Sequence, residues 1–207
     1  TAMATVTNTA TWTGADSAGG FAVNDTIPYN FEDISGTGTA VPLGDDEVSL
    51  ALPMGFTFDY FGVNYTDAYI SSNGFLTFLP GQSNGCCSGQ PIPTAGSPDA
   101  IIAAWWEDLY PPGGGSIQYQ TLGVAPNRYF IAQYTNIQHY SSGNPVTMQV
   151  KLFEGTNVIE VHYQDAPSDS GTHSAGVENE TGTVGVQYVL QSTGLVTPLA
   201  VQYTPAT

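Results

Sequence analysis

Basic side chains are almost absent from this chain of 207 residues. Arg128 and Lys151 are the only two, against 18 Asp and Glu residues, so the formal net charge is −16. Nucleic-acid binding needs Lys and Arg at the phosphates, so we predict no nucleic-acid partner and, for the same reason, no anionic membrane surface. A surface this acidic also repels copies of itself. Copies that associate would need backbone pairing, apolar contacts or divalent cations.

Long apolar runs and helical periodicity are lacking as well. No stretch approaches the roughly 20 apolar residues of a membrane helix, so we predict no membrane insertion. No basic segment followed by an apolar one marks a secretory signal. Because the first residue is Thr rather than Met, we expect a mature extracellular form, secreted or at the cell surface, whose signal has been removed. No segment shows a sustained 3.6-residue apolar period, so we expect little helix.

Cysteine is scarce, and the only two, Cys86 and Cys87, are adjacent in a loop rich in Gly, Ser, Asn and Pro. A metal site is not indicated here, because no further Cys or paired His accompanies them. We predict a disulfide between the two in an oxidising compartment, although neighbouring Cα atoms lie closer than in ordinary disulfides. Bonds to another chain and two free thiols are the alternatives.

Alternating apolar and polar residues predict an all-β fold. The pattern is clearest at 65–78, where two alternating runs flank Asn73-Gly74, a pair typical of a type I′ hairpin turn. A continuous apolar run at 100–106 predicts a fully buried strand. The other predicted strands are 27–34, 47–52, 56–60, 116–122, 129–134, 146–153, 158–163, 174–178, 184–190 and 198–203. Short strands at this spacing favour a two-sheet antiparallel β-sandwich, jelly-roll-like, as one domain over 21–207.

The N-terminal segment, residues 1–14, has a long two-residue period. Threonines occupy one parity, and mostly small apolar residues occupy the other. The apolar parity consists of Ala4, Val6, Ala10 and Trp12. A stretch at 16–20 that contains Gly and Ser follows and is typical of a hinge. Two interpretations remain open for this N-terminal unit of residues 1–20: a first strand of the domain's own sheet, or a donor strand for another subunit.

Five motifs follow one another along the chain: 70–78 (ISSNGFLTF), 98–109 (PDAIIAAWWEDL), 126–130 (PNRYF), 147–154 (TMQVKLFE) and 175–179 (AGVEN). In this order they resemble β-sandwich modules of large secreted bacterial proteins, including adhesins and protease extensions. They are more distantly similar to nidogen-like extracellular domains. The resemblance covers residues 52–190 and leaves out 1–20. It implies an extracellular β-sandwich and supplies no catalytic residues.

No catalytic constellation is visible, so we expect a protein that is not an enzyme. The histidines are His139, His162 and His173, and no HExxH or GxSxG motif surrounds them. Acidic clusters could hold Ca²⁺ through hard oxygen ligands, although none has EF-hand spacing. The acidic candidates are Asp45, Asp46, Glu47, Glu107 and Asp108, together with Asp165 and Asp169. Apart from such a Ca²⁺ ion, no cofactor is predicted.

Aromatic residues and Asn-X-Thr triplets give two hypotheses that involve glycans. Trp105, Trp106 and Tyr110 could stack on a sugar, although adjacent strand residues face opposite ways, so one Trp is expected in the core. Three triplets match the acceptor pattern for N-linked glycans. They begin at Asn24, Asn64 and Asn179.

The function favoured by these patterns is structural. We expect an extracellular β-sandwich whose copies pair head-to-tail through residues 1–14 and so build a surface fibre or matrix. The alternative, from another class, is an adhesin or carbohydrate-binding module. A fragment of a secreted hydrolase is the third.

Overall fold

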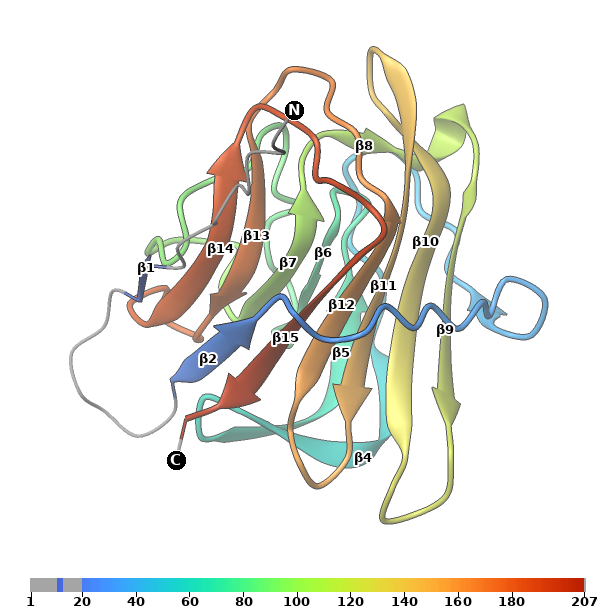
Figure 1. The fold of residues 1–207 in the computed structure, drawn as a ribbon. Helices are drawn as coiled ribbons and strands as arrows, with labels where there is room; N and C mark the ends of the chain where they lie inside the picture. Colours follow the sequence, from blue (N-terminus) through green and yellow to red (C-terminus); the bar gives the residue numbers. More distant parts are fainter. Residues whose placement is uncertain (1–10, 13–19, 207) are drawn as a thin grey trace, which may run out of the picture.

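The computed structural model of the chain describes residues 11–12 and 20–206 and consists of two antiparallel β-sheets packed face to face (Figure 1). The predicted all-β sandwich is confirmed. Within the described residues the only helical element is a short 3-10 turn, η1 (Pro111–Gly113). No helix in this part of the chain is long and apolar enough to cross a membrane.

Strands distant in sequence lie side by side in both sheets. The seven-stranded sheet has the spatial order β1 (Thr11–Trp12), β14 (Gly185–Gln191), β13 (His173–Glu178), β7 (Ile101–Trp106), β6 (Phe75–Thr77), β5 (Val63–Ile70) and β4 (Leu52–Tyr60). The eight-stranded sheet has the order β2 (Phe21–Asn24), β15 (Leu199–Pro205), β12 (Ile159–Asp165), β11 (Gly143–Phe153), β10 (Tyr129–His139), β9 (Ser116–Leu122) and β3 (Thr39–Ala40), and β8 (Leu109–Tyr110) also pairs with β10.

The space between the two sheets holds the main hydrophobic core. In β4, Met54, Phe56, Phe58 and Tyr60 are buried while the residues between them are not, which is the two-residue period of a strand with one face on the core. Every residue of β7 is buried, as its apolar run predicts. The reason is that the loop between β6 and β7 folds back over the outer face of the sheet and adds Ile92 to a second small core there.

The predicted hairpin of β5 and β6 forms, but its turn differs from the prediction. A type I′ turn centred on Asn73-Gly74 needs a positive φ at both residues, but only Gly74 has one, 78°, so the turn is not type I′. Asn73 is completely buried instead. Its side-chain N–H donates to Asp46 at 2.8 Å, and its side-chain oxygen accepts from the Leu109 N–H at 3.1 Å. Asn73 therefore ties neighbouring loops together, a role that a local turn rule does not anticipate.

Residues 27–34 do not form the predicted strand. They belong to a strap, residues 25–34, which crosses the outer face of the eight-stranded sheet (Figure 1). Three backbone N–H groups of the strap donate to side chains of that sheet: Asn30 to His162 Nδ1 at 3.2 Å, Glu32 to Gln149 Oε1 at 3.0 Å, and Ile34 to Gln133 Oε1 at 2.9 Å. These side chains meet the hydrogen-bonding needs that a neighbouring strand would otherwise meet.

Two smaller differences concern the chain before β4. The predicted strand at 47–52 contributes only an isolated bridge, between Val48 and Ser71, before β4 begins at Leu52. β3 lies within a stretch predicted to be a loop. The other predicted strands in the described residues each overlap an observed strand.

Candidate functional site

The outer edge of β14 is the first candidate site. β14 pairs with β13 on one side. On its other side β1 pairs antiparallel, with Thr11 opposite Gln187 and Trp12 opposite Val186. β1 is thus the terminal strand of the seven-stranded sheet. Val186 is 2% exposed and belongs to the core, so this short pairing borders the interior of the sandwich.

The remaining residues of the predicted assembly strand, Ala4, Val6 and Ala10, lie outside the described residues. Their sequence still bears on the β14 edge, because residues 1–14 (TAMATVTNTATWTG) contain no charged side chain. β14 (GVQYVLQ) contains none either. In a chain of net charge −16, these two segments can approach without bringing carboxylates of their own together.

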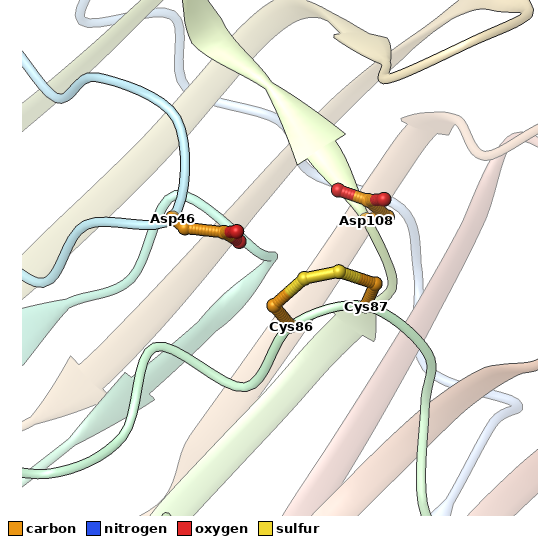
Figure 2. Close-up of side chains that lie close together, drawn as sticks. All are labelled: Asp46, Cys86, Cys87 and Asp108. Carbon is orange, nitrogen blue, oxygen red and sulfur yellow. A yellow bond between two sulfur atoms is a disulfide. The ribbon is translucent and has the colours of Figure 1, made fainter.

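A second candidate site is the corner where the loop before β4, the cysteine loop and the β7–β8 turn meet. Figure 2 shows Asp46, Cys86, Cys87 and Asp108 gathered there, and their oxygen and sulfur atoms lie within 4.8 Å of one another. Cys86 and Cys87 are joined by a disulfide, with Cα atoms 3.0 Å apart. The thiolate is the form of cysteine that binds metals, so in this state the corner offers a cation two carboxylates.

The other acidic residues of this loop are arranged differently. Glu47 accepts a hydrogen bond from the Gly44 N–H at 2.6 Å within its own loop, and Asp45 is exposed. Burial raises the pKa of Asp108 to about 6, and the negative charges of Asp46 and Asp45 add to this shift. The corner therefore concentrates negative charge, but it brings together only the carboxylates of Asp46 and Asp108, whereas Ca²⁺ takes about six to eight oxygen ligands.

The third candidate site, here called the histidine cluster, consists of Glu107, His139, Asp169 and His173. Glu107 follows β7, His139 ends β10, Asp169 lies in the β12–β13 loop, and His173 begins β13. β7 pairs with β13, and β8 pairs with β10, so the turn that carries Glu107 passes from one sheet to the other. The cluster therefore lies where the two sheets are joined at one end of the sandwich.

Three side-chain atoms surround His173 Nε2. His139 Nε2 lies 3.4 Å away, Asp169 Oδ1 3.6 Å and Glu107 Oε2 4.0 Å. Glu107 is 2% exposed, His139 1% and His173 0%, whereas the Asp169 side chain keeps 14% exposure. The Trp105 ring stacks on the His173 ring with centroids 4.7 Å apart. The cluster is thus a buried group of fixed side chains that reaches solvent through Asp169.

Hydrogen bonds fix one tautomer in this cluster and leave two atoms unpaired. His139 Nδ1 lies 2.7 Å from the Asn144 carbonyl, which places the proton on Nδ1 and leaves a lone pair on Nε2. Glu107 Oε2 and His173 Nδ1 are buried without a hydrogen-bond partner among the described residues. Unpaired buried polar atoms are uncommon in native proteins and require an explanation.

The pKa values of Glu107 and His173 are both shifted in the direction that favours the neutral side chain. Burial raises the pKa of Glu107 to about 8, and the carboxylate of Asp169 adds to the shift. Burial also lowers the pKa of His173, with His139 as the second cause, while Asp169 opposes the change. The cluster therefore presents imidazole lone pairs beside two carboxyl groups.

Sequence patterns identified only part of this cluster. Glu107 and Asp169 are among the acidic residues predicted to bind Ca²⁺, but His139 and His173 lie 34 positions apart and belong to no motif. The one local signal is the i, i+4 spacing of Asp169 and His173. Asp165, which was paired with Asp169 in that prediction, is exposed at the end of β12 and does not join the cluster.

The predicted sugar platform at Trp105 and Trp106 is wrong, because neither ring is accessible. Trp105 is 0% exposed in the main core and Trp106 is 4% exposed on the opposite face of the sheet. Their indole N–H groups donate to backbone carbonyls, Trp105 to Pro167 at 3.2 Å and Trp106 to Gly85 at 2.7 Å. The eight-stranded sheet covers one face of β7 and the β6–β7 loop covers the other, so only half-buried Tyr110 remains of that set.

The three asparagines of the Asn-X-Thr triplets differ in accessibility. Asn24 and Asn64 are exposed, the first at the end of β2 and the second in β5. Asn179 is half-buried, and its side-chain oxygen accepts from the N–H groups of Thr183 at 2.9 Å and Val184 at 3.1 Å. Asn24 and Asn64 are therefore the more accessible positions for a glycan.

Comparison with known protein families identifies the family of this chain. A family model described as NIDO related matches residues 21–206. The matched region contains every described strand except β1. No solved structure matches the chain.

Proposed function

This chain belongs to the NIDO-related family, and from that premise we propose an extracellular structural module that assembles head-to-tail into a fibre or matrix. In this assembly, residues 1–14 of one copy pair with the β14 edge of the next copy. In this structure Thr11 and Trp12 pair with β14 of their own chain, as the interpretation of residues 1–14 as an ordinary first strand expects, and the proposal starts from the fact that the outer edge of β14 accepts a strand. An extracellular setting agrees with the family, whose domains are typically extracellular. The proposed role is structural rather than enzymatic.

The edge of β14 has the properties of an acceptor. A sheet edge presents backbone N–H and C=O groups that another strand can pair with. An added strand satisfies these groups through main-chain hydrogen bonds, and its alternate side chains supply specificity. The segment that pairs with this edge comes from outside the family-matched residues 21–206. The same segment of a neighbouring copy offers the same backbone groups to the same edge.

Charge favours this contact over others between copies. The net charge is −16, yet neither residues 1–14 nor β14 carries a charged side chain. The free energy of such a contact comes mainly from backbone pairing and apolar burial, so it depends only weakly on salt. The donor and acceptor surfaces differ from each other, which makes the contact heterologous. A heterologous contact need not close into a ring and can propagate as a fibre.

Deleting residues 1–14 tests the assembly mechanism. The proposal predicts that full-length protein forms fibres in electron micrographs, whereas the truncated protein stays monomeric in size-exclusion chromatography with unchanged β-type circular dichroism. Truncated protein that still polymerises would contradict donation of this segment. Truncated protein that unfolds or aggregates would instead identify residues 1–14 as an ordinary strand of its own domain.

A matched pair of substitutions tests the parity of the donor strand. Val6 lies on the apolar parity that also contains Trp12, and Thr7 lies on the hydroxyl parity. A charge inside a core pocket is costly, whereas a charge on the solvent face is not. We therefore expect Val6→Asp to abolish fibres and Thr7→Asp to leave them intact. Equal effects of the two substitutions would contradict a strand that inserts one face.

A further inference from the structure

We propose that the histidine cluster binds a divalent transition-metal ion of the Zn²⁺ type, with His139 Nε2, His173 Nε2, Asp169 Oδ1 and Glu107 Oε2 as ligands. The site does not depend on the proposed assembly, because His173 lies opposite Gln191 at the end of β14, whereas β1 pairs with Val186 and Gln187. Imidazole nitrogens and carboxylate oxygens are ordinary Zn²⁺ ligands. Ca²⁺ takes oxygen ligands only, so two imidazoles favour a transition metal over the Ca²⁺ that the acidic residues alone suggest.

The distances from His173 Nε2 to the other ligand atoms are close to those around a tetrahedral ion. With Zn–N bonds of about 2.0–2.1 Å and Zn–O bonds of about 2.0–2.2 Å, tetrahedral ligand atoms lie about 3.3–3.5 Å apart. From His173 Nε2 the observed separations are 3.4 Å to His139, 3.6 Å to Asp169 and 4.0 Å to Glu107. The first two edges need almost no adjustment. His139, Asp169 and His173 have ligand atoms that all lie within 4.8 Å of one another, and Glu107, outside this group, would have to turn toward the ion as the fourth ligand.

The proton positions of the two rings leave a conflict that a cation removes. His139 donates through Nδ1 to the Asn144 carbonyl, so its Nε2 presents a lone pair to His173. If His173 carries its proton on Nε2, its buried Nδ1 becomes an acceptor without a donor. If the proton is on Nδ1, two lone pairs face each other across 3.4 Å. With a metal ion between the nitrogens, both lone pairs become ligand bonds.

Glu107 provides an independent observation that points to the same ion. Its side chain is 2% exposed, and Oε2 has no hydrogen-bond partner among the described residues although it faces His173. The carboxyl of Asp169 lies in the same place, so a cation would pair with two acidic groups rather than one. Two carboxyl groups held this close together are destabilising in their ionised forms unless a positive charge compensates them.

The surroundings resemble the support that metal ligands normally have. A ligating imidazole usually donates its second N–H to a carbonyl or carboxylate, which fixes its orientation, and His139 does so to Asn144. Trp105 stacks on His173 and donates to the Pro167 carbonyl at 3.2 Å, so it also anchors the loop that carries Asp169. The partly exposed Asp169 side chain gives an ion a route from solvent.

A bound ion would join three elements of the two sheets. It would link the β7–β8 turn, the end of β10 and the start of β13, together with the β12–β13 loop. Because a preformed site is absent from the unfolded chain, metal binding stabilises the folded state. The metal would therefore rigidify one end of the sandwich, much as a cross-link would.

The test uses the full-length protein under non-reducing conditions after treatment with EDTA and dialysis. Zn²⁺ is titrated by isothermal calorimetry, and Co²⁺ serves as a spectroscopic substitute because Zn²⁺ has a filled d shell. We expect one Zn²⁺ per chain, the intense visible absorption of tetrahedral Co²⁺, and a melting temperature about 5 °C or more above that of the EDTA-treated protein. Absence of saturable Zn²⁺ binding would overturn the proposal.

Two substitutions remove ligands while preserving shape. His139→Asn removes Nε2 but keeps an amide donor for the Asn144 carbonyl, and Glu107→Gln removes the charge of Glu107. Replacement of outer-shell partners weakens metal binding by about 10–100-fold, so loss of a ligand should weaken Zn²⁺ binding by at least about 100-fold. Circular dichroism checks that each variant is folded, and either variant alone suffices for the test.

Two control substitutions locate the site. His162→Asn changes the remaining buried histidine but keeps an acceptor for the Asn30 N–H, and Asp108→Asn removes one of the two carboxylates of the corner beside the disulfide. We expect both to bind Zn²⁺ with unchanged affinity. If His139→Asn and Glu107→Gln bind like the wild type, or if only Asp108→Asn weakens binding, the histidine cluster is not the metal site.

Discussion

Two buried groups of polar side chains lie at different places in this sandwich, and each contains histidine. The strap cluster consists of Gln133, Gln149, Lys151 and His162, on the outer face of the eight-stranded sheet beneath the strap. The histidine cluster consists of Glu107, His139, Asp169 and His173. Both are almost fully removed from water, so their hydrogen bonds can be compared directly.

The strap cluster is completely paired. Gln149 accepts from the Glu32 N–H at 3.0 Å and donates to the Glu32 carbonyl at 2.6 Å and to Gln133 at 2.9 Å. Both ring nitrogens of His162 are hydrogen-bonded: Nδ1 accepts from the strap, and Nε2 lies 3.0 Å from Glu160 Oε2. Lys151 Nζ donates to a strap carbonyl at 2.9 Å. No unpaired buried atom belongs to this cluster.

The histidine cluster is not paired in this way, since Glu107 Oε2 and His173 Nδ1 lack partners among the described residues. Buried polar networks stabilise a protein when every member is satisfied, and incomplete networks are costly. The strap cluster therefore has a purely structural explanation. The histidine cluster contains two atoms that no described residue pairs with, and the metal ion proposed above would bind at this place.

The largest effect is expected where the strap cluster is broken. Gln149→Ala removes three hydrogen bonds and leaves the backbone of Glu32 unpaired under the strap. Lost hydrogen bonds and unsatisfied buried groups together should lower the free energy of unfolding by about 3–5 kcal/mol. Urea unfolding followed by tryptophan fluorescence measures this change.

A glutamine on the same sheet provides the control for this substitution. Gln164 is an exposed residue of β12. Surface substitutions of this kind usually change stability by about 0.5 kcal/mol or less, so Gln164→Ala should unfold like the wild type. Similar destabilisation by both substitutions would mean that the strap contributes little beyond the sheet itself.

The strap also shows where prediction from sequence ends. The apolar pattern of 27–34 is compatible with a strand, but the partners that hold it come from residues 99 to 132 positions further along the chain. By contrast, β7 was predicted correctly from its own run of apolar residues, because burial on both faces leaves a local signal. A strand can be predicted from the spacing of apolar residues along its own sequence. A segment that is held by side chains far away in the sequence leaves no such local pattern.

The histidine cluster could not be assembled from sequence for a related reason. Its four members come from four segments, and sheet pairing rather than spacing brings them together. The clusters of acidic residues predict a bound cation, and Glu107 and Asp169 are among the ligands predicted in this way. The identity of the ligand set depends on His139 Nε2 facing His173 Nε2, and that contact exists only in three dimensions.

The second prediction compares how two carboxyl groups, one buried and one half-buried, change the stability of the protein with pH. Burial raises the pKa of Glu178 to about 8, although the Thr94 N–H donates to it at 2.9 Å. A folded pKa above the ordinary 4.5 means that this contribution to stability is full below pH 4.5 and is lost as pH rises through 8. The loss amounts to at most about 5 kcal/mol. Glu178→Gln should therefore flatten the stability profile in this range.

The pKa of the half-buried Glu160, beside the strap cluster, is shifted in the opposite direction from that of Glu178. Hydrogen bonds from His162 and Gln202 lower its pKa despite burial, so its contribution is present above the ordinary pKa and is lost as pH falls. Glu160→Gln should leave the profile between pH 4.5 and 8 essentially unchanged. Urea unfolding in EDTA at several pH values measures both variants. A Glu178→Gln profile that is as steep as the wild type would contradict the assignment.

The third prediction concerns proteolysis, because trypsin can cut after only Arg128 and Lys151. The Lys151 side chain is 3% exposed beneath the strap, and the Arg128 side chain is 31% exposed and pairs with Glu154 at 2.5 Å. Cleavage needs local opening of these strands. We expect the folded protein to resist trypsin and its first cut to follow Arg128.

Loosening the strap should change this order of cleavage. In Gln149→Ala the strap no longer holds over Lys151, so the fragment cut after Lys151 should appear earlier, as judged by mass spectrometry of the first products. Gln164→Ala again serves as the control and should be cut like the wild type. Early cleavage after Lys151 in the wild type would mean that the strap is open much of the time.

The smallest effect is expected at the cysteine pair, which borders the acidic corner beside the histidine cluster. The disulfide closes a ring between adjacent residues and so restricts the unfolded chain very little. The loop that carries it is held by other contacts, such as Trp106 donating to the Gly85 carbonyl at 2.7 Å. Cys86→Ser combined with Cys87→Ser should therefore lower the free energy of unfolding by about 1 kcal/mol or less.

Intact-mass analysis after alkylation should show no modified thiol without reductant and two with it, and two modified thiols without reductant would contradict the bond. A small effect here, beside a large gain in melting temperature on adding Zn²⁺, would attribute the rigidity of this end of the sandwich to the histidine cluster rather than to the disulfide.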